Sequence, residues 1–148
     1  MNRKGFTLIE LIATIVLLGI IASISFVSIY RVIEKNKEDN CKILVNNIKA
    51  AANEYASDNR YKISNNKMDG ININKTTITE EDGTSKQFDS IQFTAEKLIS
   101  NKYLNASIDN PYDKGNPITS NIDITVIFNQ NYTVRNVVVS NTILNKCQ

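Results

Sequence analysis

The residue best placed to do chemistry in this sequence is Glu10, a carboxylate inside an apolar run that extends from Phe6 to Tyr30. The 20 residues from Leu11 to Tyr30 carry no charge and are enough to cross a lipid bilayer as a helix. An ionised side chain in such a segment is costly unless it has a partner, so it marks a functional site. Glu10 therefore needs a cation, and none of these 20 residues supplies one.

The residues before the apolar run predict its orientation. Arg3 and Lys4 precede it, and basic residues at one end of a membrane helix keep that end in the cytoplasm. The rest of the chain would then be exported. A signal peptide or a simple membrane anchor would also be basic and then apolar. Neither alternative accounts for Glu10, or for Gly5 directly before Phe6.

The segment Lys4–Leu11 reads KGFTLIEL and resembles the N-terminal motif of type IV prepilins and pseudopilins. The resemblance implies that a prepilin peptidase cuts between Gly5 and Phe6 and methylates the new N-terminus at Phe6. It also supplies the missing cation, because the α-amine that cleavage creates is largely protonated at neutral pH. The Glu10 carboxylate of one subunit is then expected to face the Phe6 amine of its neighbour during assembly.

The membrane segment departs from the family pattern at one point. Many members carry a proline in the second half of this helix, whereas the first proline here is Pro111. Gly19 matches a common family glycine and weakens a helix by about 1 kcal/mol relative to alanine. Gly19 is therefore the expected weak point if the helix unwinds locally on assembly.

The helical pattern continues beyond the membrane to about Asn59, without glycine or proline between Arg31 and Asn59. Here the apolar residues recur at the spacing of one helix face, which predicts a buried stripe. The stripe contains Cys41, Leu44, Val45, Ile48, Ala51, Ala52 and Tyr55. The resemblance to type IV pilins implies an α+β pilin fold, in which a long N-terminal helix, half transmembrane and half amphipathic, packs against a small antiparallel β-sheet headpiece, and this change of pattern along the helix suits such a fold. The expected organisation is a leader at 1–5, a transmembrane or filament-core helix at 6–30, and an extracellular headpiece at 31–148, divided into amphipathic helix at 31–59 and loops and sheet at 60–148.

Within the headpiece, short elements alternate with turns. Segments 71–79 and 87–93 have β character on either side of the turn signal Asp82-Gly83, and 94–104 reads as a short helix with Thr94 as its N-cap. The clearest strand is 122–128, because every second residue is apolar. A loop at 129–131 and a return strand at 132–139 predict a hairpin, and 142–146 is expected as a short third strand. The sequence does not predict the strand order.

Two further sets of residues could stabilise the headpiece. Cys41 and Cys147 would meet oxidising conditions after export, and a disulfide between them would tie the C-terminus to the helix. The alternative is a buried free Cys41 and a loose Cys147. Asp109 and Asp113 lie in the loop 109–117, which contains two prolines and resembles a loop of pseudopilins, some of which bind calcium there. A plain polar turn is the expected interpretation, and neither a metal nor another cofactor is predicted.

The composition excludes several function classes. The chain has no histidine, which removes the usual general base and zinc ligand, and we expect no enzymatic activity. A net charge of +2 is too small to predict nucleic acid as a partner. The richness in Asn, Ile and Lys is typical of AT-rich genomes and suggests a Gram-positive, clostridia-like source.

These observations together predict a structural subunit of a type IV pilus. The subunit would wait in the cytoplasmic membrane with its headpiece outside and then polymerise into an extracellular filament for adhesion, twitching motility or aggregation. Its partners would be other copies of itself, other pilins, the prepilin peptidase, the pilus assembly machinery and the membrane. The alternatives are a pseudopilin of a competence or type II-like secretion system, and a membrane-tethered binding protein that never polymerises.

Overall fold

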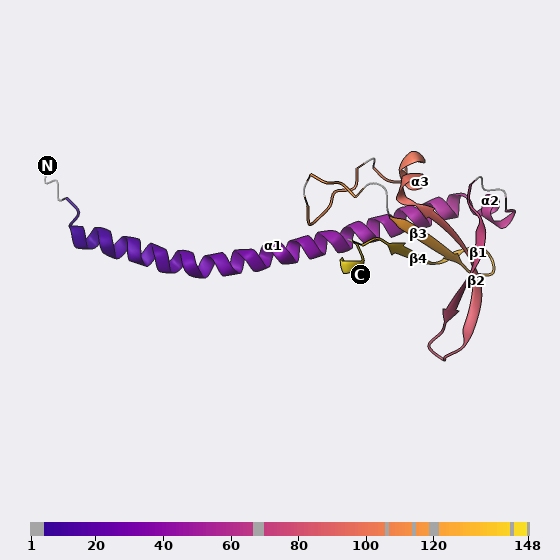
Figure 1. The fold of residues 1–148 in the computed structure, drawn as a ribbon, viewed down its shortest axis with the longest axis horizontal. Helices are drawn as coiled ribbons and strands as arrows, with labels where there is room; N and C mark the ends of the chain where they lie inside the picture. The colour runs from indigo at the N-terminus through magenta and orange to yellow at the C-terminus, as the bar shows by residue number, and fades with distance from the viewer. Residues whose placement is uncertain are drawn as a thin grey trace. The chain divides into compact units, whose positions relative to one another are not determined.

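The computed structural model describes residues 5–66, 70–105, 107–113, 115–118, 122–142 and 144–147, and of residues 24–27, 146 and 147 only the backbone. Two compact units share these residues, Met1–Lys37 and Glu38–Gln148. The elements, in order, are α1 (Leu8–Asp58), α2 (Arg60–Ser64), β1 (Ile73–Thr79), β2 (Ser85–Thr94), α3 (Ala95–Ser100), β3 (Asp123–Phe128), β4 (Val134–Ser140) and the 3₁₀ helix η1 (Leu144–Cys147). The long N-terminal helix and the small antiparallel sheet confirm the predicted α+β class (Figure 1).

The first unit is the N-terminal part of α1. Its large apolar side chains are exposed all round the helix, from Leu8 at 77% to Val32 at 57%. By length and composition, α1 is the one helix in the described part of the chain that could cross a membrane, with a mean hydropathy of 2.5 in its most apolar window. The helix continues through Gly19, whose carbonyl accepts a 2.7 Å hydrogen bond from the Ser23 hydroxyl. A side chain added at Gly19 would meet open space.

The second unit is built on the apolar stripe of α1 that the sequence predicts. Cys41, Ile48 and Ala52 are fully buried, and Leu44 is partly buried against the same core. Ala56, which the prediction missed, extends the stripe by one more position. Along the stripe, α1 packs against the sheet (Figure 1). The helical period of the apolar residues is thus explained by one buried face.

The sheet has the strand order β1-β2-β3-β4, and every neighbouring pair is antiparallel. The predicted alternation in β3 is confirmed, because Ile124, Val126 and Phe128 are at most 1% exposed and point toward the core. β2 joins two partners, since its first half pairs with β1 and its second half with β3. The predicted antiparallel arrangement therefore extends to all four strands.

Local contacts set two element boundaries. α1 ends at Asp58, in agreement with the expected end at about Asn59, and the Asn59 side-chain amide donates a 2.9 Å hydrogen bond to the Tyr55 carbonyl before α2 begins. β4 begins at Val134 instead of residue 132, because Tyr132 adopts a left-handed backbone with φ 58°. The Asn131 side chain then accepts hydrogen bonds from the amide and hydroxyl of Thr133, which extends the loop.

Two further predictions need correction. The helix expected over 94–104 covers only Ala95–Ser100, because Lys102 has φ 66° and the Tyr103 amide bonds back to the Leu98 carbonyl at 2.9 Å. The third strand expected at 142–146 is wrong, since the backbone there forms η1. Asn141 starts this turn: its side-chain oxygen accepts from the Leu144 amide and its carbonyl accepts from the Asn145 amide.

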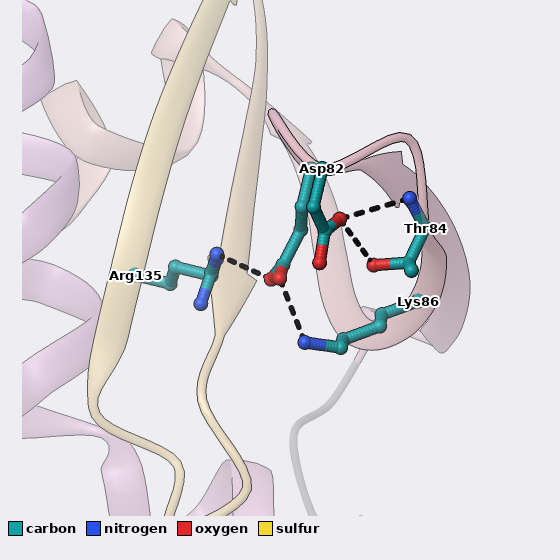
Figure 2. Close-up of polar contacts among 5 residues, drawn as sticks. Asp82, Thr84, Lys86 and Arg135 are labelled. Atoms are coloured by element: carbon teal, nitrogen blue, oxygen red, sulfur yellow. Dashed lines mark hydrogen bonds and ion pairs between the residues drawn. The ribbon is translucent and has the colours of Figure 1, made fainter.

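A polar clasp holds the β1–β2 hairpin against β4. Glu80, directly after β1, forms ion pairs with Lys86 at 2.7 Å and with Arg135 of β4 at 3.2 Å. Figure 2 labels the two basic residues and marks their contacts with dashed lines. The Arg135 guanidinium also lies 4.4 Å from the centroid of the Phe88 ring. Ile127 of β3, which alternates with the core residues and so faces away from α1, is only 4% exposed. Ile127 is thus covered on the outer face of the sheet.

Beside the clasp, the hairpin turn is closed by Asp82. Its carboxylate accepts hydrogen bonds from the Thr84 amide at 2.9 Å and from the Thr84 hydroxyl at 2.6 Å (Figure 2). Gly83 has φ 80°, a conformation that residues with a side chain rarely adopt. The turn predicted at Asp82-Gly83 is therefore present, with a side chain and a glycine that suit it.

The clasp predicts a specific dependence on pH. The hydrogen bond from Lys86, together with the positive charges of Lys86 and Arg135, holds the pKa of the Glu80 carboxyl below its ordinary value of 4.5. Because the folded-state pKa is lowered, the stabilisation is complete above the ordinary value and is lost as the pH falls through the folded-state pKa. We expect the difference in thermal midpoint between wild type and Glu80→Gln, measured by circular dichroism in detergent, to be largest at neutral pH and to disappear in acid only once the pH is below the folded-state pKa of Glu80. A difference that does not change with pH would contradict the ion-pair role.

Candidate assembly site

The predicted cleavage site lies in a short non-helical segment before α1. Gly5, Phe6 and Thr7 precede the first helical residue, Leu8, and Phe6 is 84% exposed. A side chain added at Gly5 would meet nothing within 4 Å. The Gly5–Phe6 peptide bond is therefore outside the helix and open to an enzyme, whereas the basic residues Arg3 and Lys4 lie outside the described residues.

Glu10 has a hydrogen-bonding partner in its own chain, contrary to the sequence-based expectation that it finds none there. The Thr7 amide and the Thr7 hydroxyl each donate a 2.9 Å hydrogen bond to Glu10 Oε2. The Glu10 amide in turn donates to the Thr7 hydroxyl oxygen at 3.4 Å. This reciprocal pattern is a capping box, which satisfies backbone amides at the start of a helix.

The capping box gives the Glu10 carboxylate hydrogen-bond donors but no counter-charge. Thr7 is neutral, so it satisfies hydrogen bonds of the carboxylate without balancing its charge. Both recorded bonds end on Oε2, and in the part of the chain that the structure describes no bond to Oε1 is recorded. One carboxylate oxygen is thus held in place by the helix start, and the other is available to a cation from outside the chain.

Thr7 is the functional residue that the sequence reasoning missed. The signal was present, because a threonine followed three residues later by a glutamate before an apolar run is the pattern of a capping box. Thr7 positions the Glu10 carboxylate at the N-terminal end of α1.

The structure describes the side chain of Cys41 but only the backbone of Cys147. Cys41 is fully buried in the core of the second unit, in the same cluster as Leu144 of η1. The side chain of Cys147, three residues further on, lies outside the described residues. The backbone of η1 therefore brings the C-terminal end of the chain to the core that contains Cys41, and the Cys41–Cys147 disulfide stays a prediction.

The loop with Asp109 and Asp113 is held by its own polar groups. Asp113 Oδ2 accepts a 2.7 Å hydrogen bond from the Asn116 amide group, and the Tyr112 backbone amide donates to Asn110 Oδ1 at 3.0 Å. Among the residues that the structure describes, no group of three or more His, Cys, Asp or Glu side chains comes together. This loop adds no residue to the assembly site.

Residues 1–26 match the family model described as the prokaryotic N-terminal methylation motif. The chain carries the class III signal of type IV pilins and pseudopilins. No curated protein and no solved structure matches the chain. The motif covers Gly5, Phe6, Thr7 and Glu10, which are the residues of the site described above, and it also covers Gly19.

The motif has direct consequences for processing and location. It implies a pilin-like or pseudopilin-like precursor that a prepilin peptidase processes and that assembles with a type IV filament or its machinery. The motif and the apolar N-terminal helix fit anchoring in a membrane before assembly. The fold described above, a long helix with a small antiparallel sheet, is consistent with a pilin fold.

The disulfide prediction can be tested by mass and by stability. We expect the intact mass of the mature protein to rise by two hydrogen atoms on reduction, because Cys41 and Cys147 are the only two cysteines. Reduction should also lower the unfolding free energy by up to about 4–5 kcal/mol, the loop-closure contribution for about 105 intervening residues. The Cys147→Ser variant serves as the control, because reductant should change neither its mass nor its stability. An unreduced wild-type mass equal to the reduced one would contradict the bond.

Proposed function

We propose that this protein is a structural subunit of a type IV pilus and has no enzymatic activity. The precursor is held in the cytoplasmic membrane, is cut between Gly5 and Phe6 and is methylated on Phe6. The subunits then polymerise through α1 into a surface filament for adhesion, motility or aggregation. The methylation motif leading directly into an exposed apolar helix is the observation that carries the proposal.

The chemistry of the helix start supports a role for Glu10 in ordering the polymer. Cleavage creates an amine on Phe6 with a reference pKa of about 7.7–8.0, so the amine is mostly charged at neutral pH. This amine cannot exist in the precursor, and the carboxylate oxygen that Thr7 leaves available suits it. We assign the pair a role in register between subunits rather than a net stability, because desolvation offsets much of the attraction between buried charges.

Basic residues support the proposed orientation. Arg3 and Lys4 would keep the leader in the cytoplasm, where the scissile bond at Gly5–Phe6 would meet the peptidase. The second unit, Glu38–Gln148, would lie outside the membrane. A pseudopilin would share the same processing and orientation, and deleting the gene while scoring surface fibres against DNA uptake or protein export separates the two.

Processing is tested most directly by the intact mass of the mature protein. We expect a mass that corresponds to residues 6–148 plus one methyl group, because the motif places cleavage after Gly5 and methylation on Phe6. In cells without prepilin peptidase the mass should be that of the full chain without the methyl group. A membrane-tethered protein that never polymerises would keep its leader even when the peptidase is present, and that result would reject the proposal.

The role of Glu10 is tested by replacing it with alanine. We expect Glu10→Ala to reduce sheared filaments to a small fraction of the wild-type yield, because the Phe6 amine would be left without its counter-charge in the filament core. Glu34→Ala is the matched control: it removes an exposed glutamate of the same helix, whose recorded ion pair is local, with Lys37 at 3.2 Å. Both variants should reach the membrane in equal amounts, as judged by immunoblotting. Normal filament yield from Glu10→Ala would remove the basis of the pairing argument.

A further inference from the structure

The outer face of the sheet, opposite the face that packs against α1, carries a group of polar side chains. On β2 these are Gln92 and Thr94, which lie opposite Thr125 and Asp123 of β3 in the strand register. They alternate along the strands with residues packed on the core, so they point away from α1. Together with Phe93 they line a hollow of about 420 Å³. We call these four polar residues the outer-face site.

Within the residues that the structure describes, no hydrogen bond or ion pair is recorded for the four side chains of the outer-face site. Thr94 is the N-cap of α3, yet its hydroxyl makes no capping bond. Gln92 and Asp123 are exposed, and Thr94 and Thr125 are half-buried. Side chains directly opposite each other in a sheet lie about 5 Å apart. A carboxylate, an amide and two hydroxyls are therefore within reach of one small ligand.

We propose that the outer-face site binds a neutral glycan. A sugar ring presents several hydroxyl groups, each a donor and an acceptor, which matches an amide and two hydroxyls that also do both. Two neighbouring sugar hydroxyls can donate to the two oxygens of the Asp123 carboxylate. The lining contains this one negative charge and no basic side chain, so a phosphate, a sulfate or a uronic acid would meet a like charge. The inference rests on the proposed function, to which it adds a ligand for adhesion.

An apolar side chain lies beside the outer-face site and suits the carbon-bound hydrogens of a sugar. Val138 of β4 lies directly opposite Thr125 and is 42% exposed. Binding sites for small molecules combine such apolar contact with a few placed polar groups. The Phe93 ring packs against the Tyr55 ring, with centroids 5.2 Å apart, so it offers no exposed platform and a single site should bind weakly. A filament would repeat the site on every subunit, and repetition converts weak binding into avidity.

The ligand class is tested with the full-length chain in vesicles of phosphatidylcholine, a lipid without sugar. The vesicles carry many copies of the chain, so the measurement needs no filament. They are applied to immobilised oligosaccharides that are neutral, sulfated, phosphorylated or rich in uronic acids. We expect retention on at least one neutral glycan and at least tenfold less on the acidic ones, because Asp123 repels them. Absence of retention on every neutral glycan, or a preference for acidic glycans, would overturn the inference.

A matched pair of double variants locates the site. Gln92→Ala with Asp123→Ala removes an amide and a carboxylate from the outer-face site. Gln87→Ala with Glu81→Ala is the control, because it removes the same kinds of group and the same charge from exposed positions outside the hollow. We expect the first pair to lower retention at least tenfold and the control to leave it unchanged, with equal thermal midpoints by circular dichroism.

Unchanged retention in the first pair, or an equal loss in both pairs, would overturn the inference. Failure of the proposed function is seen in a different measurement. If the wild-type chain forms no filaments in cells, the pilus role is rejected, whereas retention of the vesicles on neutral glycans still reports on the outer-face site.

Discussion

The headpiece depends on one contact, the packing of the apolar stripe of α1 against the inward side of the sheet. Cys41, Ile48 and Ala52 from the helix share a single core with Ile124 and Phe128 from β3. A small domain of this kind buries a limited fraction of its surface, and without the helix its strands would have nothing to cover. The same helix therefore supports the sheet of the headpiece through its apolar stripe. Its apolar half is the part of the chain that needs lipid or another subunit. A substitution that weakens the stripe would affect the domain on which the filament surface is built.

The elements that could be predicted are those buried on one face only, because their apolar residues recur at a regular spacing in the sequence. The stripe has the helical period and β3 has the period of two, because a core covers only one side of each. The features that could not be predicted depend on groups far apart or on single side chains. Arg135 and Glu80 are 55 residues apart in the chain, and no local pattern indicates that they meet. The break between α1 and α2 and the turn into η1 depend on the side chains of Asn59 and Asn141.

The same distinction applies to the assembly site. The motif from Gly5 to Glu10 could be recognised from its residue types, because it is a short continuous run of sequence that does not depend on contacts with distant residues. The sequence argument treated Glu10 as a charge with no partner inside the chain, and the structure gives it the hydrogen bonds of Thr7. The difference matters physically. A carboxylate without hydrogen bonds would be strongly disfavoured in an apolar setting, whereas one held by two donors loses part of that cost and keeps its charge.

Glu10 receives hydrogen bonds from its own chain but needs a counter-charge from another one, and this helps to explain how a polymer could be ordered. A carboxylate that rotated freely could meet an incoming amine in many arrangements, but Thr7 holds one oxygen at the first turn of α1 and so restricts the direction from which the amine can approach.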